Sequence, residues 1–315
     1  MGCAPHREFA AKAREVKLLD PAISTERKPF SRIVFPVDFS ERVKAIAPCV
    51  RLWARRFDSH ITVLHVFDLV HDHHLEPSLD PECGSSVGEI PYTPALREIR
   101  DSRQGHLEKF ARDRFAGLDY ITLVEDGDTA RLIDWVVRRE SADLVIMPSK
   151  GLGKFRRLLG GSITERVLHD VSCPVLTSSP LAESGEIGER GYRSIVCAVE
   201  VDREADRVLK VAGFLAREFG AKLSVVHTEP PAIPAEQEAA DADLLREKVR
   251  QDFETGEVKV RVLDSTVEQG IRFAATVEKA DLVVVGRGHE AEFFGRIWSH
   301  LYAIIRESPC PVLSV

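Results

Sequence analysis

Short apolar runs alternate along the chain with longer segments in which apolar residues recur at helical spacing. In the first half the helical pattern follows residue 40, covers 94–115 and 129–139, and resumes at 162. Unbroken apolar runs are typical of strands buried on both faces of a parallel sheet. Strands that alternate with helices indicate parallel pairing through right-handed crossovers, so the pattern predicts an α/β fold. The runs expected to form strands are 33–37, 61–67, 120–124, 143–147 and 174–177.

The same order of elements returns in the second half. Its predicted strands are 194–199, 222–227, 258–262, 281–285 and 311–315. The two halves also close alike, with SCPVL at Ser172–Leu176 and PCPVL at Pro309–Leu313. These matches indicate a tandem duplication. We expect an N-terminal tail (1–29, with a short helix near 8–19), a first domain (30–179), a linker rich in Glu, Gly and Pro (180–191) and a second domain (192–315).

Composition narrows the class of protein. A chain of 315 residues is long enough for two domains, and 44% hydrophobic with 30% charged residues is ordinary for a globular protein. The net charge of −7 favours neither nucleic acid nor an anionic membrane surface, and no apolar run approaches the roughly 18 residues of a membrane span. The six scattered cysteines form no CxxC pair, so we expect reduced thiols in a cytoplasmic protein.

Each half contains a stretch with the features of a phosphate-binding loop. Residues 143–162 read DLVIMPSKGLGKFRRLLGGS, which passes from a predicted strand through a glycine-bearing loop to a predicted helix start. Glycine lets the backbone approach a ligand, and a helix N-terminus offers unpaired N–H groups and the positive end of the helix dipole. A less regular copy begins at Asp281.

Three segments resemble the universal stress protein family: IVFPVDFS at 33–40, VLHVF at 63–67, and 142–176 with its GLGKFRRLLGGS loop. The resemblance covers nearly all of 30–179 and, more loosely, 192–315. It implies two tandem Rossmann-like domains, each a five-stranded parallel sheet flanked by helices. It also implies that the C-terminal strands, 174–177 and 311–315, meet across a two-fold axis within one chain. We therefore expect an intramolecular pseudo-dimer, which could in addition form a homodimer.

The resemblance further implies adenine-nucleotide binding in members that keep the motif Gly, two residues, Gly, nine residues, Gly, Ser or Thr. The resemblance implies that the aspartate after the first strand contacts adenine or ribose, and that the backbone after the second-strand histidine contacts adenine. It implies that the motif residues contact ribose and phosphates. Pro148 replaces the first glycine of the motif here; it lacks an N–H and fixes φ near −65°. The positions that match nucleotide-contacting residues are Asp38, Val66, Gly151, Gly161, Ser162 and Ile163.

Each of these residues also has a purely structural interpretation. Ser162 and Glu165 have the Ser-x-x-Glu spacing of a capping box, which a helix start favours with or without a ligand. Asp38 is as well placed to be the N-cap of the first helix as to contact a ligand. The adjacent Gly160 and Gly161 allow close packing of a helix on the sheet as readily as close approach of a ligand.

The second half has lost more of the motif. Gly286 keeps the first glycine, but His289 replaces the next, and Ser299-His300 replaces the final Gly-Ser pair. Glu200 and Thr228 stand where the first half has Asp38 and Val66. We therefore expect a degenerate partner domain, and we assign neither a metal site nor a catalytic residue in the chain.

The sequence leaves three functions open. The first is a stress-response regulator that binds ATP, with its magnesium ion, in the first-domain crevice. The second is an interaction or scaffold protein that binds unknown protein partners and no nucleotide. The third is a slow ATPase, which is disfavoured because the sequence offers no evident general base or metal carboxylate. The polar insertions at 68–93 and 228–238 are candidate lids over the two crevices.

Overall fold

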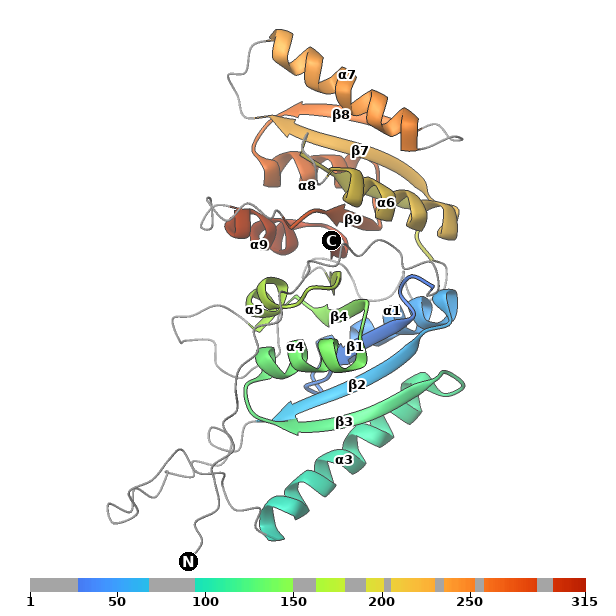
Figure 1. The fold of residues 1–315 in the computed structure, drawn as a ribbon, viewed down its shortest axis with the longest axis vertical. Coiled ribbons are helices and arrows are strands. Elements are labelled where there is room, and N and C mark those ends of the chain that lie inside the picture. The colour runs from blue at the N-terminus through green and yellow to red at the C-terminus, as the bar shows by residue number, and fades with distance from the viewer. Residues whose placement is uncertain are drawn as a thin grey trace, which may run out of the picture.

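A computed structural model describes residues 28–67, 94–149, 163–178, 191–200, 205–229, 235–252, 258–287 and 297–315. Their strands form one ten-stranded sheet in the order β3-β2-β1-β4-β5-β10-β9-β6-β7-β8 (Figure 1). The strands of the first half are β1 (Arg32–Pro36), β2 (His60–Phe67), β3 (Tyr120–Asp126), β4 (Leu144–Pro148) and β5 (Val175–Ser178). Those of the second half are β6 (Ser194–Ala198), β7 (Lys222–Glu229), β8 (Lys259–Asp264), β9 (Leu282–Val285) and β10 (Val312–Ser314).

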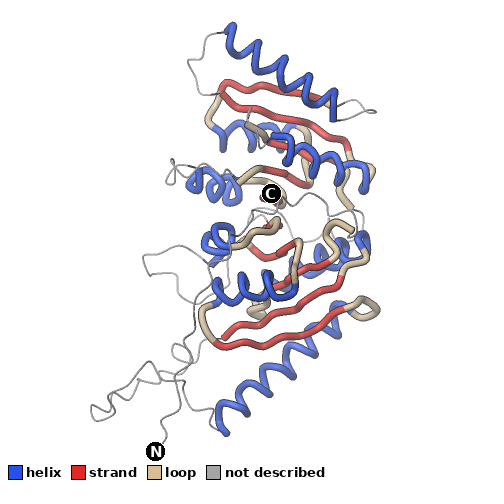
Figure 2. Tube along the Cα trace, viewed as in Figure 1, coloured by secondary structure: helices blue, strands red, loops and turns tan. Residues whose placement is uncertain are grey.

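Helices flank the strands of both halves (Figure 2). In the first half α1 contacts α3 and α4 contacts α5, and in the second half α6 contacts α7 and α8 contacts α9. Their bounds are α1 (Glu41–Phe57), α3 (Pro94–Phe115), α4 (Thr129–Glu140), α5 (Ile163–Asp170), α6 (Ala205–Phe219), α7 (Ala235–Asp252), α8 (Val267–Val277) and α9 (Ile297–Glu307). The predicted fold class is confirmed: each half contributes five parallel strands to a Rossmann-like α/β domain.

Each half-sheet contains an inner strand that is apolar along its whole length. Every residue of β4 (LVIMP) and of β9 (LVVV) is buried. A strand with both faces covered by helices has no solvent-facing side chains, so its sequence does not alternate between apolar and polar residues. The unbroken apolar runs were therefore correctly interpreted as central strands.

The two halves are joined through their last strands. β5 and β10 pair antiparallel, with Leu176 opposite Leu313. Two hydroxyls reinforce the pairing reciprocally: Thr177 Oγ1 donates to the Val312 carbonyl, and Ser314 Oγ donates to the Val175 carbonyl. The predicted meeting of the C-terminal strands within one chain is thus confirmed. The pairing also removes two exposed sheet edges, which would otherwise offer unpaired backbone groups to other strands.

A second junction lies between α1 and the start of the second half. Tyr192 is buried, and its hydroxyl accepts a hydrogen bond from Trp53 Nε1 at 2.9 Å. The ring of Phe57 stacks on that of Phe214 in α6, with centroids 5.8 Å apart. Aromatic pairs of this kind add roughly 0.5–1.5 kcal/mol each beyond their buried area. The two halves therefore share one continuous hydrophobic core.

One of the two interpretations of Asp38, and the predicted bounds of one insertion, were wrong. The N-cap of α1 is Ser40, whose hydroxyl accepts from Val43 N; Asp38 instead accepts from Ser40 N. The segment 228–238 is not a continuous insertion, because Thr228 and Glu229 end β7 and α7 already begins at Ala235. The segments 1–27, 68–93 and 179–190 lie outside the described residues, as does the helix expected near 8–19. None of the described helices is long and apolar enough to cross a membrane.

Candidate functional site

The carboxyl ends of β1, β2 and β4 meet at one edge of the first half-sheet. β1 pairs parallel with β4 on one side, with Ile33 beside Leu144, and with β2 on the other. The chain runs from β1 outward to β2 and β3 and then returns to β4 on the opposite side of β1. Reversal of strand order in this way defines a topological switch point, and ligands of open α/β sheets bind at its carboxyl edge.

Asp38 lies at this edge, two residues beyond the end of β1. Its side chain is partly buried, and Oδ1 accepts a hydrogen bond from Ser40 N at 2.9 Å. The other carboxylate oxygen has no hydrogen-bond partner among the described residues. Phe39, which lies between Asp38 and Ser40, has a positive φ of 59°, a conformation that costs a non-glycine residue about 1 kcal/mol or more. The turn therefore presents an acceptor at the switch point at some cost in backbone strain.

His65 fixes the chain that carries Asp38. Its Nδ1 lies 2.7 Å from the carbonyl oxygen of Val37, and its Nε2 lies 3.2 Å from an Arg103 guanidinium nitrogen. A carbonyl can only accept and a guanidinium can only donate, so Nδ1 carries the proton and Nε2 accepts. The neutral imidazole thus ties the end of β1 to β2. Val66 follows in β2, partly buried and paired with Glu125 of β3.

The start of α5 lies directly against the end of β4. Thr164, in the first turn of α5, is buried, and its hydroxyl donates to the carbonyl of Pro148 at 3.4 Å. Pro148 is itself buried and pairs with Ser178 of β5. Ile163 is the first residue of α5, so this predicted site residue does lie at the switch-point edge. Gly151, Gly161 and Ser162 lie outside the described residues, and their roles stay predictions.

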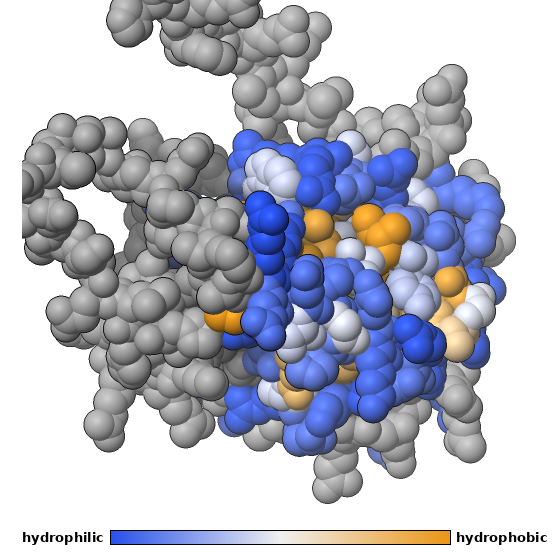
Figure 3. All heavy atoms as spheres, turned by 90° about the horizontal axis from the view of Figure 1, so that it is seen from below, coloured by the Kyte–Doolittle hydropathy of each residue, from blue (hydrophilic) through white to orange (hydrophobic). Residues whose placement is uncertain are grey.

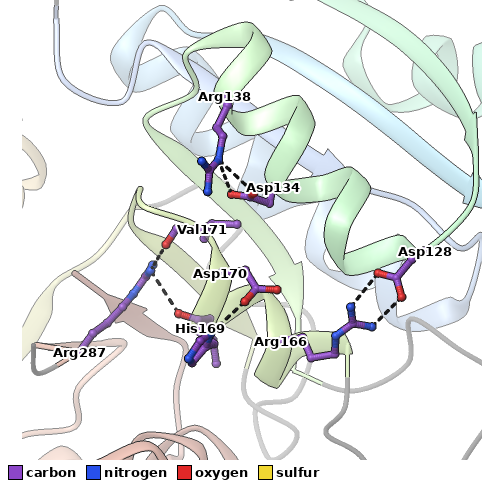
Figure 4. Close-up of polar contacts among 9 residues, drawn as sticks. Asp128, Asp134, Arg138, Arg166, His169, Asp170, Val171 and Arg287 are labelled. Atoms are coloured by element: carbon purple, nitrogen blue, oxygen red, sulfur yellow. Dashed lines mark hydrogen bonds and ion pairs between the residues drawn. The ribbon is translucent and has the colours of Figure 1, made fainter. Parts of the chain in front are cut away.

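An ion pair clamps α5 to α4 near the predicted ligand end. Arg166 donates from two guanidinium nitrogens to the two carboxylate oxygens of Asp128, at 2.7 and 2.9 Å (Figure 4). Asp128 is also the N-cap of α4, accepting from Arg131 N. The guanidinium lowers the pKa of Asp128 below its ordinary value, and the carboxylate raises that of Arg166. Bidentate pairs constrain geometry as well as adding energy.

The opposite end of α5 is held by a residue of the second domain. Arg287 is buried, and its guanidinium donates to the carbonyls of Leu168 and Val171 (Figure 4). It also donates to the carbonyl of Cys173. Its Nε contacts Ser314 Oγ. Burial lowers the pKa of Arg287 to about 10, which leaves the side chain charged at neutral pH. The cation suits this position because the carbonyls at a helix C-terminus carry partial negative charge.

The corresponding edge of the second domain is built differently. His227 repeats the bond to the end of the first strand, with Nδ1 2.9 Å from the Val199 carbonyl. Its Nε2 faces Glu229 Oε1 at 3.6 Å instead of an arginine. Thr228 packs onto the first turn of α8, where a Cβ on Gly270 would lie 2.4 Å from its methyl group. Within the described ranges, no three His, Cys, Asp or Glu side chains are grouped so as to hold a metal ion.

Sequence reasoning missed the two arginines that hold α5. Asp128 directly precedes the predicted helix at 129, so its capping role could have been found from the sequence. The partner in α5 could not, because nothing in the local pattern distinguishes Arg166 from any other exposed charge on that helix. Arg287 follows the glycine that the second motif retains, and its burial against α5 depends on the packing of the two domains.

Comparisons with known proteins agree with this architecture. The family model described as Universal stress protein family matches residues 29–178 and again 191–315. A universal stress protein of Thermus aquaticus is 35% identical over 148 residues, which is 47% of this chain and 97% of that protein. One of Methanocaldococcus jannaschii is 24% identical over 169 residues, which is 53% of this chain and 93% of that protein.

Solved structures extend the likeness to both domains at once. The crystal structure of a universal stress protein from Archaeoglobus fulgidus superposes with a TM-score of 0.67 at 22% identity, covering 91% of this chain and 97% of that one. A functionally unknown protein from Pseudomonas aeruginosa PAO1 gives a TM-score of 0.59 at 15% identity, covering 91% and 92%. At these identities the likeness shows a shared fold, including the tandem arrangement.

Proposed function

The chain belongs to the universal stress protein family, and from this membership we propose that its first domain binds an adenine nucleotide as a regulatory ligand. We take that domain as 30–179 and the degenerate second domain as 192–315, joined by 180–191. The observation that carries the proposal is the convergence of the Asp38 carboxylate and the start of α5 at one switch-point edge.

Each end of a nucleotide has a matching group at this edge. Asp38 is held with one oxygen toward its own turn, which leaves the other to accept from a ribose hydroxyl or the adenine amino group. The backbone at Val66 lies at the end of β2, where it would contact adenine. Gly151, Gly161, Ser162 and Ile163 would hold ribose and phosphates, with the helix dipole of α5 favouring their negative charge.

The clamps on α5 support this assignment. A helix that binds phosphates must keep its N-terminus fixed relative to the sheet, because the ligand contacts both. Arg166 holds α5 to the start of α4, Thr164 holds it to β4, and Arg287 holds its far end. Preorganisation of this kind lowers the entropic cost of binding. ATP with Mg²⁺ is the form we expect to bind.

The protein is expected to act in the cytoplasm, because its described cysteines are buried thiols. Cys49, Cys173, Cys197 and Cys310 are all free. Burial raises the pKa of Cys173 and of Cys310 to about 12, so neither forms a reactive thiolate at neutral pH.

Calorimetric titration with ATP and Mg²⁺ tests the proposal. The double variant Gly161→Ala, Ser162→Ala should weaken binding by at least about tenfold, because it removes a close backbone approach and a hydroxyl from the phosphate end. The matched control is Ser299→Ala, His300→Ala, which changes the corresponding positions of the second domain and should leave the affinity unchanged.

Three results would contradict the proposal. Absence of binding heat in the wild type favours the scaffold function. Unchanged affinity in the first double variant places the ligand elsewhere. Steady release of inorganic phosphate from ATP, lost in the same variant, makes the protein a slow ATPase instead of a regulator.

A further inference from the structure

A groove lies at the outer edge of the second domain. β8 is the last strand of the sheet among the described residues, and α7 runs beside it (Figure 1). Between them is a groove of about 650 Å³. Its lining residues are Ala239, Ala242, Asp243 and Arg246 of α7 with Val260, Arg261, Val262 and Leu263 of β8.

On the β8 side, the groove is lined by four residues that are consecutive in the sequence. Side chains alternate between the two faces of a strand, so a groove lined by four consecutive residues is bounded by the backbone of β8 as well as by its side chains. One edge of this backbone pairs with β7, and the other pairs with no strand among the described residues. Such an edge presents a row of N–H and C=O groups ready to bond another strand.

The first domain closes the same edge with two side chains of α3. Arg100 donates to the backbone carbonyl of Val124 at 3.0 Å, and Gln104 Nε2 donates to Thr122 Oγ1 at 2.8 Å. His65 pairs with Val124 of β3 and His227 with Val262 of β8, so Val124 and Val262 occupy corresponding positions. Counting back equally along the chain from these two residues, Thr122 corresponds to Val260 and Gln104 to Ala242. A methyl group opposite a valine cannot form the hydrogen bond that Gln104 and Thr122 form, so this contact between helix and strand is missing beside β8.

The closed edge of the first domain lies at the end of the molecule where β3 and α3 are found. Seen from that end, the residues drawn in colour are mainly hydrophilic, and the hydrophobic ones among them form small separate patches (Figure 3). The exposed apolar area there is the scattered kind that needs no binding partner.

The side chains around the groove define the sequence of an incoming strand. Lys259 and Arg261 both bond the single carboxylate of Glu278, the C-cap of α8, so that face of β8 has two cations for one anion. Val260 and Val262 alternate with them and face the opposite side, where Ala239 and Ala242 supply apolar groups and Arg246 is paired with Asp243. A strand added here would meet positive charge on one face and apolar groups on the other.

We propose that the groove between α7 and β8 binds an extended peptide segment of a partner protein, in which acidic and apolar residues alternate. The segment adds to β8 as an eleventh strand. Backbone hydrogen bonds supply affinity, and the alternating side chains supply specificity. The site lies at the far end of the second domain and does not depend on nucleotide binding in the first.

A second copy of the chain fits this edge poorly. Two β8 strands related by a two-fold axis normal to the sheet place equivalent faces on the same side. Lys259 and Arg261 of one copy would then lie beside the same cations of the other, and like charges at cross-strand positions are destabilising. An acidic partner strand has the opposite effect.

Fluorescence anisotropy of a labelled peptide with the full chain tests the proposal. The peptide has a core of six alternating Val and Glu residues, the length of β8. The control peptides are a rearranged one with its three valines and three glutamates in two blocks, and a Val-Lys version. Only the alternating acidic peptide should bind, and its addition should slow amide exchange over 259–264.

Variants then locate the site. Ala242→Gln with Val260→Thr installs in the second domain the bridge that closes the first, and should weaken binding by at least about tenfold without lowering the melting temperature. Lys259→Glu should weaken it similarly through charge reversal. The matched control Gln104→Ala in the first domain should have no effect, because Arg100 still covers the strand there.

Failure of the wild type to bind the peptide would overturn the proposal, as would equal binding of the rearranged peptide or of the Ala242→Gln, Val260→Thr variant. If light scattering shows a dimer that this variant abolishes, the occupant is a second copy and not a partner segment, which also overturns it. All of these outcomes leave the nucleotide titration unaffected, so the two proposals can fail separately.

Discussion

The two domains keep the same scaffold contacts and differ in the contacts at their edges. In domain 1 the Asp143 carboxylate accepts from the backbone N–H groups of Ser31 and Arg32, at the start of β1. In domain 2 Asp281 accepts from Arg193 and Ser194 in the same way. The bond from the second-strand histidine to the end of the first strand is also present twice.

The contacts that differ lie at the carboxyl edge and at the outer strand. Domain 1 has the Asp128–Arg166 clamp, whereas the corresponding α8 N-cap in domain 2, Thr266, makes no side-chain capping bond. Domain 1 has a closed outer edge, whereas that of domain 2 is open. The contacts that build the sheet are thus the same in both domains, whereas the edges differ. We propose that these edges have separate functions: a nucleotide crevice in the first domain and a peptide groove in the second.

Substitution of Arg287 should have the largest effect on stability, because this residue of the second domain holds the end of α5 in the first domain. Arg287→Ala leaves three carbonyls at the end of α5 without their donor and opens a cavity, which should cost about 3 kcal/mol. For domains of this size that corresponds to a fall in melting temperature of roughly 6–12 °C. Differential scanning calorimetry measures it.

The control for this prediction is the residue at the same position of the first motif. Ser149 is buried but makes no side-chain hydrogen bond within the described part of the chain. Ser149→Ala should therefore cost less than about 1 kcal/mol. Equal destabilisation by the two substitutions would contradict the interpretation of Arg287 as a clasp between domains.

The Asp128–Arg166 clamp gives a smaller effect that depends on pH. Asp128→Asn keeps the N-cap, since asparagine caps as well as aspartate, but removes the ion pair, and should cost about 1 kcal/mol at neutral pH. The folded-state pKa of Asp128 is lowered by Arg166, so the stability due to the pair is present above the ordinary pKa. It is lost as the pH falls through the lowered value.

Urea unfolding at several pH values checks this prediction. The difference between wild type and Asp128→Asn should shrink toward zero in acid. Thr266→Ala at the matched cap of domain 2 should change stability by less than about 0.5 kcal/mol at every pH, because that hydroxyl makes no capping bond. A pH-independent loss for Asp128→Asn would show that geometry, not charge, is what the aspartate contributes.

The fold could be predicted almost entirely from the sequence. Runs such as those of β4 and β9 are long, apolar and bounded by helical patterns, so their burial follows from local sequence alone. The antiparallel join of β5 and β10 could be predicted from the resemblance, because the matching CPVL segments place equivalent strands at the end of each half. Errors were confined to boundaries such as Thr228, where a polar residue continues a strand.

The site was less predictable, because its main contacts join residues distant in the sequence. Asp38 could be placed at the edge, but its bond to Ser40 N, not the cap of α1, was decided by one turn with a positive φ at Phe39. Arg166 and Arg287 act through partners in other elements, and no local pattern announces them. The open edge of β8 follows from Ala242 and Val260, which appear as ordinary core-facing residues until the two domains are compared.

The number of ATP molecules bound per chain tests the division of function between the domains most directly. Equilibrium dialysis with radiolabelled ATP and Mg²⁺ should give one ATP per chain, and Asp38→Ala should abolish that binding while Glu200→Ala, at the corresponding position of domain 2, leaves it intact. Two ATP molecules per chain, or one that is lost with Glu200→Ala and retained with Asp38→Ala, would contradict the account.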